Sequence, residues 1–438
     1  MLLRLLLIIT LGCGIWLDAG TVQAAVGHAS SGSAASSGGR MLRVGLVLRT
    51  MSINISSSGS YVVRDAETGK GLGKFGADAL VSLRVSKQQL LLNGKPIAAK
   101  SLEVVPQDQQ AFVKLGSKRY RGRLLVLLRS GGITVVNQLP LEEYLYGVLP
   151  SEMPADWPAE ALKAQAVAAR TFAIHNIGRH AEAGFDLCAT THCQVYDGMT
   201  GESPATSAAV DATNGQVLYY AGKPIYAAFH TSSGGMTENS EDVWGNYVPY
   251  LRAVHDDDQA SPSHHWNVKF TAPEVQIKLV SAGYDIGVLQ KIELTPLHLG
   301  AGRTADRSAT GRVQTLRFMG TKKTVILTGD EVRKAFSLKS TLFDIRIEKP
   351  NIQSIEVDNG LDTKKLPVDL PDIEEKNYGA EKMHVLHNKN GETVVFDGYG
   401  WGHGLGMSQW GARSMALKAD YRAILAHYYS NTEIKKIY

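Results

Sequence analysis

The feature that most constrains the fold is a long Ala-rich segment, PAEALKAQAVAARTFAIHNIG, at residues 158 to 178. Pro158 at the first helical position and Glu160 in the first turn are typical of a helix start. Apolar residues then recur at helical spacing, which predicts one long helix. Because alanine side chains are short, neighbouring elements can approach this helix closely. We therefore expect the helix to lie in the interior of a domain.

The residues before this helix have a different pattern, with short β-type runs separated by turn signals such as SSSGS, NGK and SGG. Such runs predict an antiparallel β module. The fold class expected is α+β, a mixed helix and antiparallel β core with an N-terminal β module and an inserted β-rich region. The domain boundaries expected are 41–140 for the β module, 141–260 for the first part of the core, 261–390 for the insertion with an exposed charged segment at 350–385, and 391–438 for the last part of the core.

The first 25 residues contain one early arginine, Arg4, and then an apolar run followed by small residues. This pattern favours a cleaved signal peptide (1–25) over a retained membrane anchor. Residues 26–40 form a flexible Gly/Ser/Ala linker with no means of building a core. We therefore expect an exported protein, in the periplasm or cell wall. The 46 basic and 42 acidic side chains leave a net charge of only +4, which on charge alone gives no argument for nucleic acid binding.

Glu152 lies between Pro150 and Pro154, just before the Ala-rich helix. The two prolines make the segment rigid, and the apolar side chains around it predict a partly buried carboxyl group with a raised pKa. Such a group suits a general acid, whereas the alternative is a carboxylate that only caps or solvates a turn. Arg170, within the helix, is either a solvated surface charge or a buried cation aimed at an anion.

The segment CATTHC brings Cys188, His192 and Cys193 within six residues. Two thiolates and an imidazole would suit Zn²⁺, with His180 or His175 as the fourth ligand. The alternative is a disulfide between the two cysteines, which an oxidising compartment favours. The spacing permits either.

Two further segments carry polar residues among glycines. Ser232 and Ser233 precede a Gly pair in FHTSSGG, which suggests a hydrogen-bonding loop that grips sugar or peptide. In GYGWGHGLGMSQWGA the glycines alternate from Gly398 to Gly406, which predicts a strand with one bare face and His403 on the other. The aromatic residues after the serine loop suit either a carbohydrate surface or a core.

Together these segments resemble the SpoIID/LytB family, named for the stage II sporulation protein D and an amidase enhancer. The stretches that carry the resemblance include LPLEEYLYGVLPSEMPADWPAEALKAQAVAARTFA, YDGMTGE, FHTSSGGMTENSEDVWG and GYGWGHGLGMSQWGA. The resemblance implies a peptidoglycan lytic transglycosylase with Glu152 as catalytic acid and Arg170 as a second functional residue. It also implies a zinc site, for which the residues are Cys188, His192, Cys193 and His180. The substrate contacts that we assign within the matching motifs are Ser232, Ser233, Gly234, His403, Gln409 and Tyr196.

The implied substrate is the glycan strand of peptidoglycan, often after removal of its stem peptides. Glu152 would protonate the glycosidic oxygen and then accept a proton from the C6 hydroxyl of N-acetylmuramic acid, which closes a 1,6-anhydro ring. Ordinary glycosidases need two carboxylates, and this scheme needs one. The main alternative is a glycan-binding protein without catalysis that enhances a partner cell-wall amidase. A third hypothesis is a zinc hydrolase that uses the Cys/His cluster. A zinc site in which protein side chains fill all four positions is usually structural, however.

Overall fold

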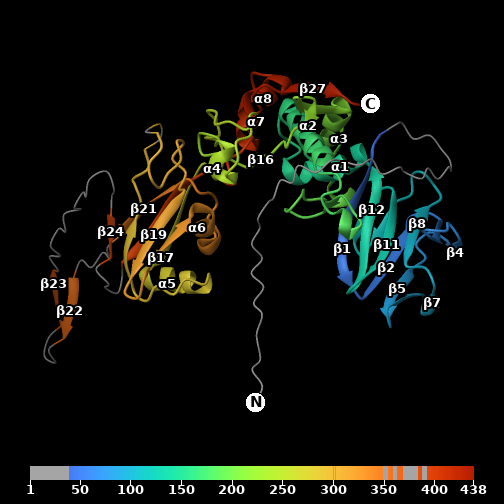
Figure 1. Ribbon diagram of the computed structural model, residues 1–438, viewed down its shortest axis with the longest axis horizontal. Coiled ribbons are helices and arrows are strands. Elements are labelled where there is room, and N and C mark those ends of the chain that lie inside the picture. The colour runs from blue at the N-terminus through green and yellow to red at the C-terminus, as the bar shows by residue number, and fades with distance from the viewer. Residues whose placement is uncertain are drawn as a thin grey trace, which may run out of the picture. The chain divides into compact units, whose positions relative to one another are not determined.

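The structure is a computed structural model, and it shows the mixed helix and antiparallel sheet architecture expected of an α+β protein (Figure 1). The residues that it describes are 39–298, 300, 302–348, 354–358, 363–367, 383–386 and 392–438. The expected signal peptide, nearly all of the linker and most of the 350–385 segment lie outside these residues. Among the described residues, no helix combines the length and apolar character that a membrane span requires.

The N-terminal β module contains two sheets. In the first, neighbouring strands are antiparallel except that β13 runs parallel to β1. Its order is β13 (Leu187–Cys188), β1 (Met41–Thr50), β12 (Gly132–Pro140), β11 (Arg123–Arg129), β8 (Ser101–Pro106), β3 (Tyr61–Asp65) and β4 (Gly71–Phe75). The order of the second is β10 (Lys118–Tyr120), β9 (Val113–Leu115), β2 (Ser52–Ser57), β5 (Val81–Ser86), β6 (Gln89–Leu92) and β7 (Lys95–Ile97).

The Ala-rich segment forms helix α2 (Ala159–His175), as the pattern predicted, and its alanines are almost all buried. Elements from the first part of the core and from its last part both pack against α2. Because they approach α2 closely, its surface carries short side chains. In Figure 1 the red C-terminal elements lie beside the green helices. The helices that contact α2 are α1 (Leu141–Glu152), α3 (Pro204–Ala212), α7 (Gln409–Met415) and α8 (Tyr421–Tyr428). The same part of the chain also contains α4 (Ser240–Trp244) and the short helices η1 (Ala181–Ala183) and η2 (Gly198–Gly201).

Two small sheets join the first and last parts of this core. β27 (Glu433–Lys436) pairs with β14 (Gln216–Tyr220), which also pairs with β15 (Lys223–Pro224). β16 (Phe229–His230) pairs in parallel with β26 (Met407–Ser408). Residues far apart in the sequence therefore share one hydrophobic core, separate from the core of the inserted region.

The inserted region has its own core, built from residues between 266 and 396. The phenylalanines of this core, among them Phe336 and Phe396, contact one another. The strand order of one of its sheets is β17 (His265–Thr271), β25 (Thr393–Tyr399) and β21 (Phe343–Glu348). The strand order of another is β20 (Thr324–Thr328), β19 (Thr315–Gly320), β18 (Leu289–Glu293) and β24 (Met383–Val385). It also contains α5 (Ala272–Ser281), α6 (Gly329–Phe336) and the hairpin β22 (Ser354–Asp358) and β23 (Thr363–Pro367), which falls in the 350–385 segment.

Candidate active site

Glu152 is the last residue of α1, and the sequence around it explains why the helix ends there. Met153 precedes Pro154, and a residue before proline avoids the helical conformation. Met153 is accordingly extended, while its N–H still bonds to the carbonyl of Leu149 at 2.9 Å. The carboxyl group is thereby held at a defined helix end instead of on a mobile loop.

The Glu152 side chain is partly buried and accepts two hydrogen bonds. One comes from Nε2 of Gln409 at 3.3 Å and the other from the backbone N–H of Val195. Burial raises the pKa of Glu152 to about 7, although both hydrogen bonds lower it. The C-terminal end of a helix also disfavours a negative charge. The group can therefore be protonated near neutral pH, as a general acid requires.

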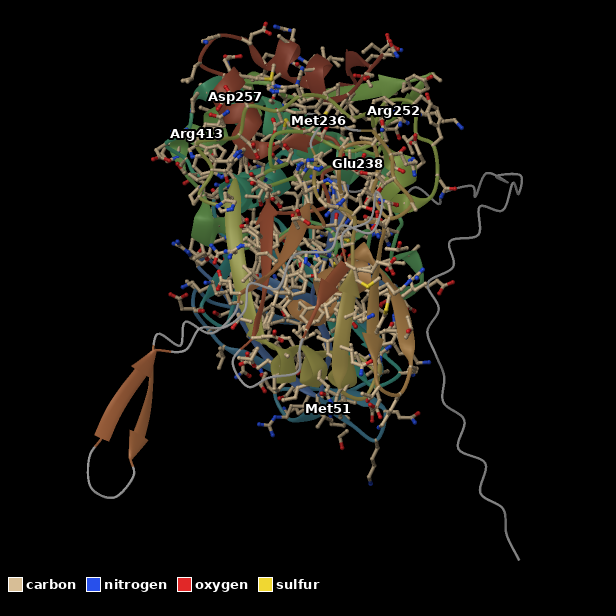
Figure 2. The ribbon with its side chains drawn as sticks, turned by 90° about the vertical axis from the view of Figure 1, so that its left-hand side faces the viewer. Met51, Met236, Glu238, Arg252, Asp257 and Arg413 are labelled. Atoms are coloured by element: carbon tan, nitrogen blue, oxygen red, sulfur yellow. The ribbon has the colours of Figure 1, made fainter. Side chains whose placement is uncertain are left out.

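Trp157, Trp410 and Arg413 form a group beside this acid that the sequence analysis did not identify. The two indole rings pack edge to face with their centroids 4.9 Å apart, and the Arg413 guanidinium lies 5.1 and 5.7 Å from them. Among the described residues, no carboxylate forms an ion pair with Arg413, and its Nε is buried without a partner. Figure 2 labels Arg413 in the upper part of the molecule, beside the red C-terminal elements.

One helix connects this group to Glu152. Gln409 and Arg413 are four residues apart on α7, so they lie on the same face about one turn from each other. The sequence signal that would have identified the group is the pair of indoles, one five residues after Glu152 and the other directly after Gln409. An aromatic surface with a cation beside a protonated carboxyl group can hold a sugar carrying an anion.

Arg170 is fully buried, and its guanidinium pairs with Glu142 through two hydrogen bonds of 2.8 and 2.6 Å. Its other N–H groups face the carbonyls of Val210 and Gln216 and the hydroxyl of Thr213. Glu142 is at the start of α1 and Glu152 is at its end, about 15 Å away along the helix. Of the two alternatives for Arg170, the structure shows the buried cation aimed at an anion, and that anion is Glu142, not Glu152.

The Cys/His segment folds back on itself, and Cys188 and Cys193 are both free thiols. Their sulfur atoms and one nitrogen each of His180 and His192 all lie within 4.8 Å of one another. Nε2 of His180 lies 3.4 Å from Sγ of Cys193. Nδ1 of His192 lies 3.6 Å from Sγ of Cys188 and 3.6 Å from Sγ of Cys193. His175 instead bonds to the carbonyl of Pro224, so the alternative fourth ligand is not in this group.

These separations fit a tetrahedral zinc site. Zinc bonds of about 2.0–2.3 Å to nitrogen and sulfur place neighbouring ligand atoms about 3.3–3.8 Å apart. Burial lowers the pKa of His180, which favours the neutral imidazole that a metal needs. The loop also reaches the acid directly, because Val195, two residues after Cys193, donates its N–H to Glu152.

The serine loop has a structural role in this molecule. Ser233 is fully buried and donates to Asp256 at 2.5 Å, while Ser232 donates to Asp258, which also accepts the N–H of Gly234 at 2.8 Å. Both hydroxyl groups are therefore committed to carboxylates inside the protein. The sequence analysis expected Ser232, Ser233 and Gly234 to contact a sugar directly. Their burial and their internal partners contradict that expectation.

The glycine-rich segment is a loop, and the expected strand with one bare face is wrong. β25 ends at Tyr399, and Gly400, Gly402, Gly404 and Gly406 all have positive φ. Close approach, which the glycines also predicted, does occur: a Cβ on Gly404 would lie 2.6 Å from the Arg312 guanidinium. The serine and glycine loops pair through Ser232 and Trp401, whose backbone groups exchange hydrogen bonds of 3.1 and 2.7 Å.

His403 and His230 hold the glycine loop from two sides. The N–H of Leu405 donates to Nδ1 of His403 at 3.0 Å, and Nδ1 of His230 lies 3.1 Å from the Leu405 carbonyl. Burial, together with the positive charge of Arg312, lowers the pKa of His403 to about 4. His403 is therefore neutral and engaged with the backbone at physiological pH.

Tyr196 is buried, with its hydroxyl group donating to Asn137 at 2.8 Å and its ring 5.0 Å from that of Tyr144. This position anchors the Cys/His loop to β12 and corrects the expectation of a substrate contact. Of the six residues assigned to substrate, the structure brings only Gln409 to Glu152.

The fold and this site define a mixed α+β protein with a protonatable glutamate at a helix end. A family model described as "Stage II sporulation protein" matches residues 129–220. The chain is 33% identical to the stage II sporulation protein D of Bacillus subtilis over 69% of this chain and 76% of the relative. It is 32% identical to an uncharacterized protein of Brachyspira hyodysenteriae over 76% of each chain.

The chain therefore belongs to the SpoIID/LytB family, as the resemblance implied, and its role is related to the cell wall. It is also 31% identical to the amidase enhancer of Bacillus subtilis, over 81% of this chain. It spans about half of that relative (49%), so the activity of the whole relative does not transfer directly.

Proposed function

We propose that the protein is a peptidoglycan lytic transglycosylase that cleaves the bond between N-acetylmuramic acid and N-acetylglucosamine. The observation that carries the proposal is Glu152, partly buried at the end of α1 with a pKa of about 7. The aromatic group of Trp157, Trp410 and Arg413 supports a glycan substrate, because indole faces stack on sugar rings and the guanidinium binds carboxylates.

The chemistry requires one carboxyl group that acts twice. Protonated Glu152 donates its proton to the glycosidic oxygen as the bond from that oxygen to C1 of N-acetylmuramic acid breaks. The carboxylate left on Glu152 accepts the proton of the C6 hydroxyl, and O6 bonds to C1 to close the 1,6-anhydro ring. Because the nucleophile belongs to the same sugar, its effective concentration is high and no activated water is needed. Gln409 and the Val195 N–H orient the carboxyl group.

Zinc belongs to this proposal as a structural ion held by Cys188, Cys193, His180 and His192. These residues offer four donors and leave no open position for a substrate, which is the pattern of a structural site. The ion would hold the loop that carries Val195, while the proton transfers remain with Glu152. We also propose that the protein acts outside the cytoplasm, in the periplasm or cell wall.

A second candidate function is enhancement of a cell-wall amidase by a protein that binds glycan without cutting it. The observation that favours it is the name of one relative, the amidase enhancer of Bacillus subtilis. The two candidates share a substrate and differ in whether Glu152 performs chemistry.

Incubation of the purified protein with intact and peptide-free glycan, without any amidase, tests the proposal. Mass spectrometry of the products is expected to show 1,6-anhydro ends, and Glu152→Gln is expected to abolish them while glycan binding remains. Glu143→Gln is the matched control, because Glu143 is a half-buried carboxyl group at the other end of the same helix. Retention of the protein on glycan without any anhydro product would support the amidase enhancer instead.

A further inference from the structure

One end of the β module carries a groove of about 650 Å³ that the proposed function does not use. Three chain reversals meet there: the one between β1 and β2, the β5–β6 turn, and the β11–β12 turn. The residues that line it are Met51, Val85, Lys87, Gln88, Lys100, Leu128, Arg129, Ser130, Gly131 and Gly132. Figure 2 shows Met51 at the lower edge of the ribbon.

Four exposed cations surround this groove. Lys87, Lys100 and Arg129 line it, and Arg49 lies against Gly131, where an added Cβ would be 3.8 Å from Cδ of Arg49. The lining includes neither aspartate nor glutamate, and among the described residues none of these four cations forms an ion pair. The groove is therefore a site of uncompensated positive charge.

The charge is a property of the whole module. Residues 41–140 contain 15 lysines and arginines but only 5 aspartates and glutamates, although the net charge of the whole chain is +4. The positive charge is thus concentrated in this module, and the rest of the chain is acidic on balance. Such an asymmetry is typical of a protein that approaches an anionic surface or polymer.

The backbone at the groove has an unusual conformation for the residues that it carries. Lys87 and Gln88 form a two-residue turn in which both have positive φ, 47° and 61°. Such turns favour Asn-Gly, because most side chains clash there. The next turn in the same sheet does use Asn93-Gly94. The β5–β6 turn therefore presents a lysine in a strained conformation at the edge of the groove.

Large apolar side chains are exposed beside these cations. Leu48, next to Arg49, is 55% exposed and Met51 is 57% exposed. Binding of a soluble anionic polymer would need only the cations, whereas binding to a lipid surface is strengthened by both the cations and the exposed apolar side chains. Aliphatic side chains enter the boundary between headgroups and acyl chains, and lysine and arginine pair with lipid phosphates.

The groove is separate from the candidate active site. It includes Gly132, the first residue of β12, while Pro140 at the other end of that strand leads into α1. A strand of nine residues spans about 27 Å. None of the residues that line the groove belongs to the candidate active site, so the two sites are made by different side chains.

We propose that this end of the β module binds the surface of an anionic phospholipid membrane. Arg49, Lys87, Lys100 and Arg129 bind the lipid phosphates, and Leu48 and Met51 insert among the headgroups. Attachment there keeps the protein at the membrane while the site around Glu152 faces outward to its polymer. The proposal does not depend on catalysis by Glu152.

Vesicle binding tests it. The protein is sedimented with vesicles of phosphatidylcholine alone and of phosphatidylcholine mixed with phosphatidylglycerol, and only the mixed vesicles are expected to retain it. Lys87→Asn with Gln88→Gly restores the favoured turn, so folding is retained, and adding Lys100→Gln removes a second cation. Each cation near an anionic surface contributes about fivefold to binding, so this variant should bind about 25-fold more weakly.

Lys74→Gln with Lys95→Gln is the matched control, because both lysines are exposed in the same module and neither lines the groove. It should bind nearly as the unchanged protein does, and equal weakening by both variants would overturn the proposal. Leu48→Ser with Met51→Ser should weaken vesicle binding. If it does not, and soluble poly(glycerol phosphate) competes fully, the groove binds a phosphodiester polymer and the membrane proposal is wrong.

Discussion

Replacing Glu152 with glutamine separates the chemistry of this residue from its effect on stability. Glutamine keeps an oxygen that can accept the hydrogen bonds from Gln409 and Val195, so the local structure should be retained. It has no proton to donate, so anhydro product should fall by about 10²–10⁴-fold. The stability of the variant should instead improve at high pH, for a reason that the structure supplies.

Burial raises the pKa of Glu152 from 4.5 to about 7 in the folded protein. Such a shift corresponds to about 3 kcal/mol. Between these two pH values the folded protein retains a proton that the unfolded chain has released, so the free energy of unfolding falls as pH rises through this window. The stabilisation is fully present below pH 4.5 and is lost above pH 7.

Urea unfolding of the unchanged protein and of Glu152→Gln at several pH values from 4 to 8 measures this difference. Other titrating groups affect both proteins alike, so their contributions cancel. The glutamine variant should gain up to about 3 kcal/mol relative to the unchanged protein by pH 8. The activity of the unchanged protein should decline as pH rises through 7, because the acid form is lost. A difference in stability that stays constant with pH, or full activity of the variant, would refute the reasoning.

Three further predictions concern the surroundings of the acid. Arg170→Met should lower the free energy of unfolding by about 3–5 kcal/mol, because it leaves the Glu142 carboxylate buried without its partner; an unchanged urea midpoint with lost activity would indicate catalysis by Arg170 instead. Cys193→Ser, or a strong chelator, should remove one bound zinc per chain by elemental analysis and lower the melting temperature, and an unaltered melting curve would argue against a structural ion. Arg413→Gln should weaken binding of glycans that carry carboxylates by about tenfold but leave binding of neutral chitin fragments unchanged, as measured by calorimetry on the Glu152→Gln background. Equal loss for both glycans would assign Arg413 to packing against the indoles.

Much of this protein could be predicted from the sequence because the signals are local. The Ala-rich run predicted a helix over residues 158 to 178, and α2 spans Ala159–His175. Pro154 predicted that Glu152 stands at a helix boundary, since proline restricts the residue before it. The short distance between the two cysteines and His192 predicted that their side chains could converge, and His180 joins them. The same motifs also indicated the family correctly.

Other features depend on contacts that no local pattern encodes. Arg170 could have faced the acid or the interior, and only the packing of α1 against α2 determined that it binds Glu142. The alternating glycines have the period of a strand, but their positive φ values follow from the neighbours that press against them, among them Arg312. The serines became structural because Asp256 and Asp258 reach them from another segment.

The sequence by itself determined the helix that organises the core, the position of Glu152 at a helix boundary before it, and the family. The tertiary structure alone decided which side chains share the neighbourhood of that acid. Gln409, Trp410 and Arg413 lie more than 250 residues from Glu152 in the chain, and α7 brings them to the acid when it packs against α2. Burial by those distant segments is also what raises the pKa of Glu152, because desolvation depends on everything that surrounds a group in space.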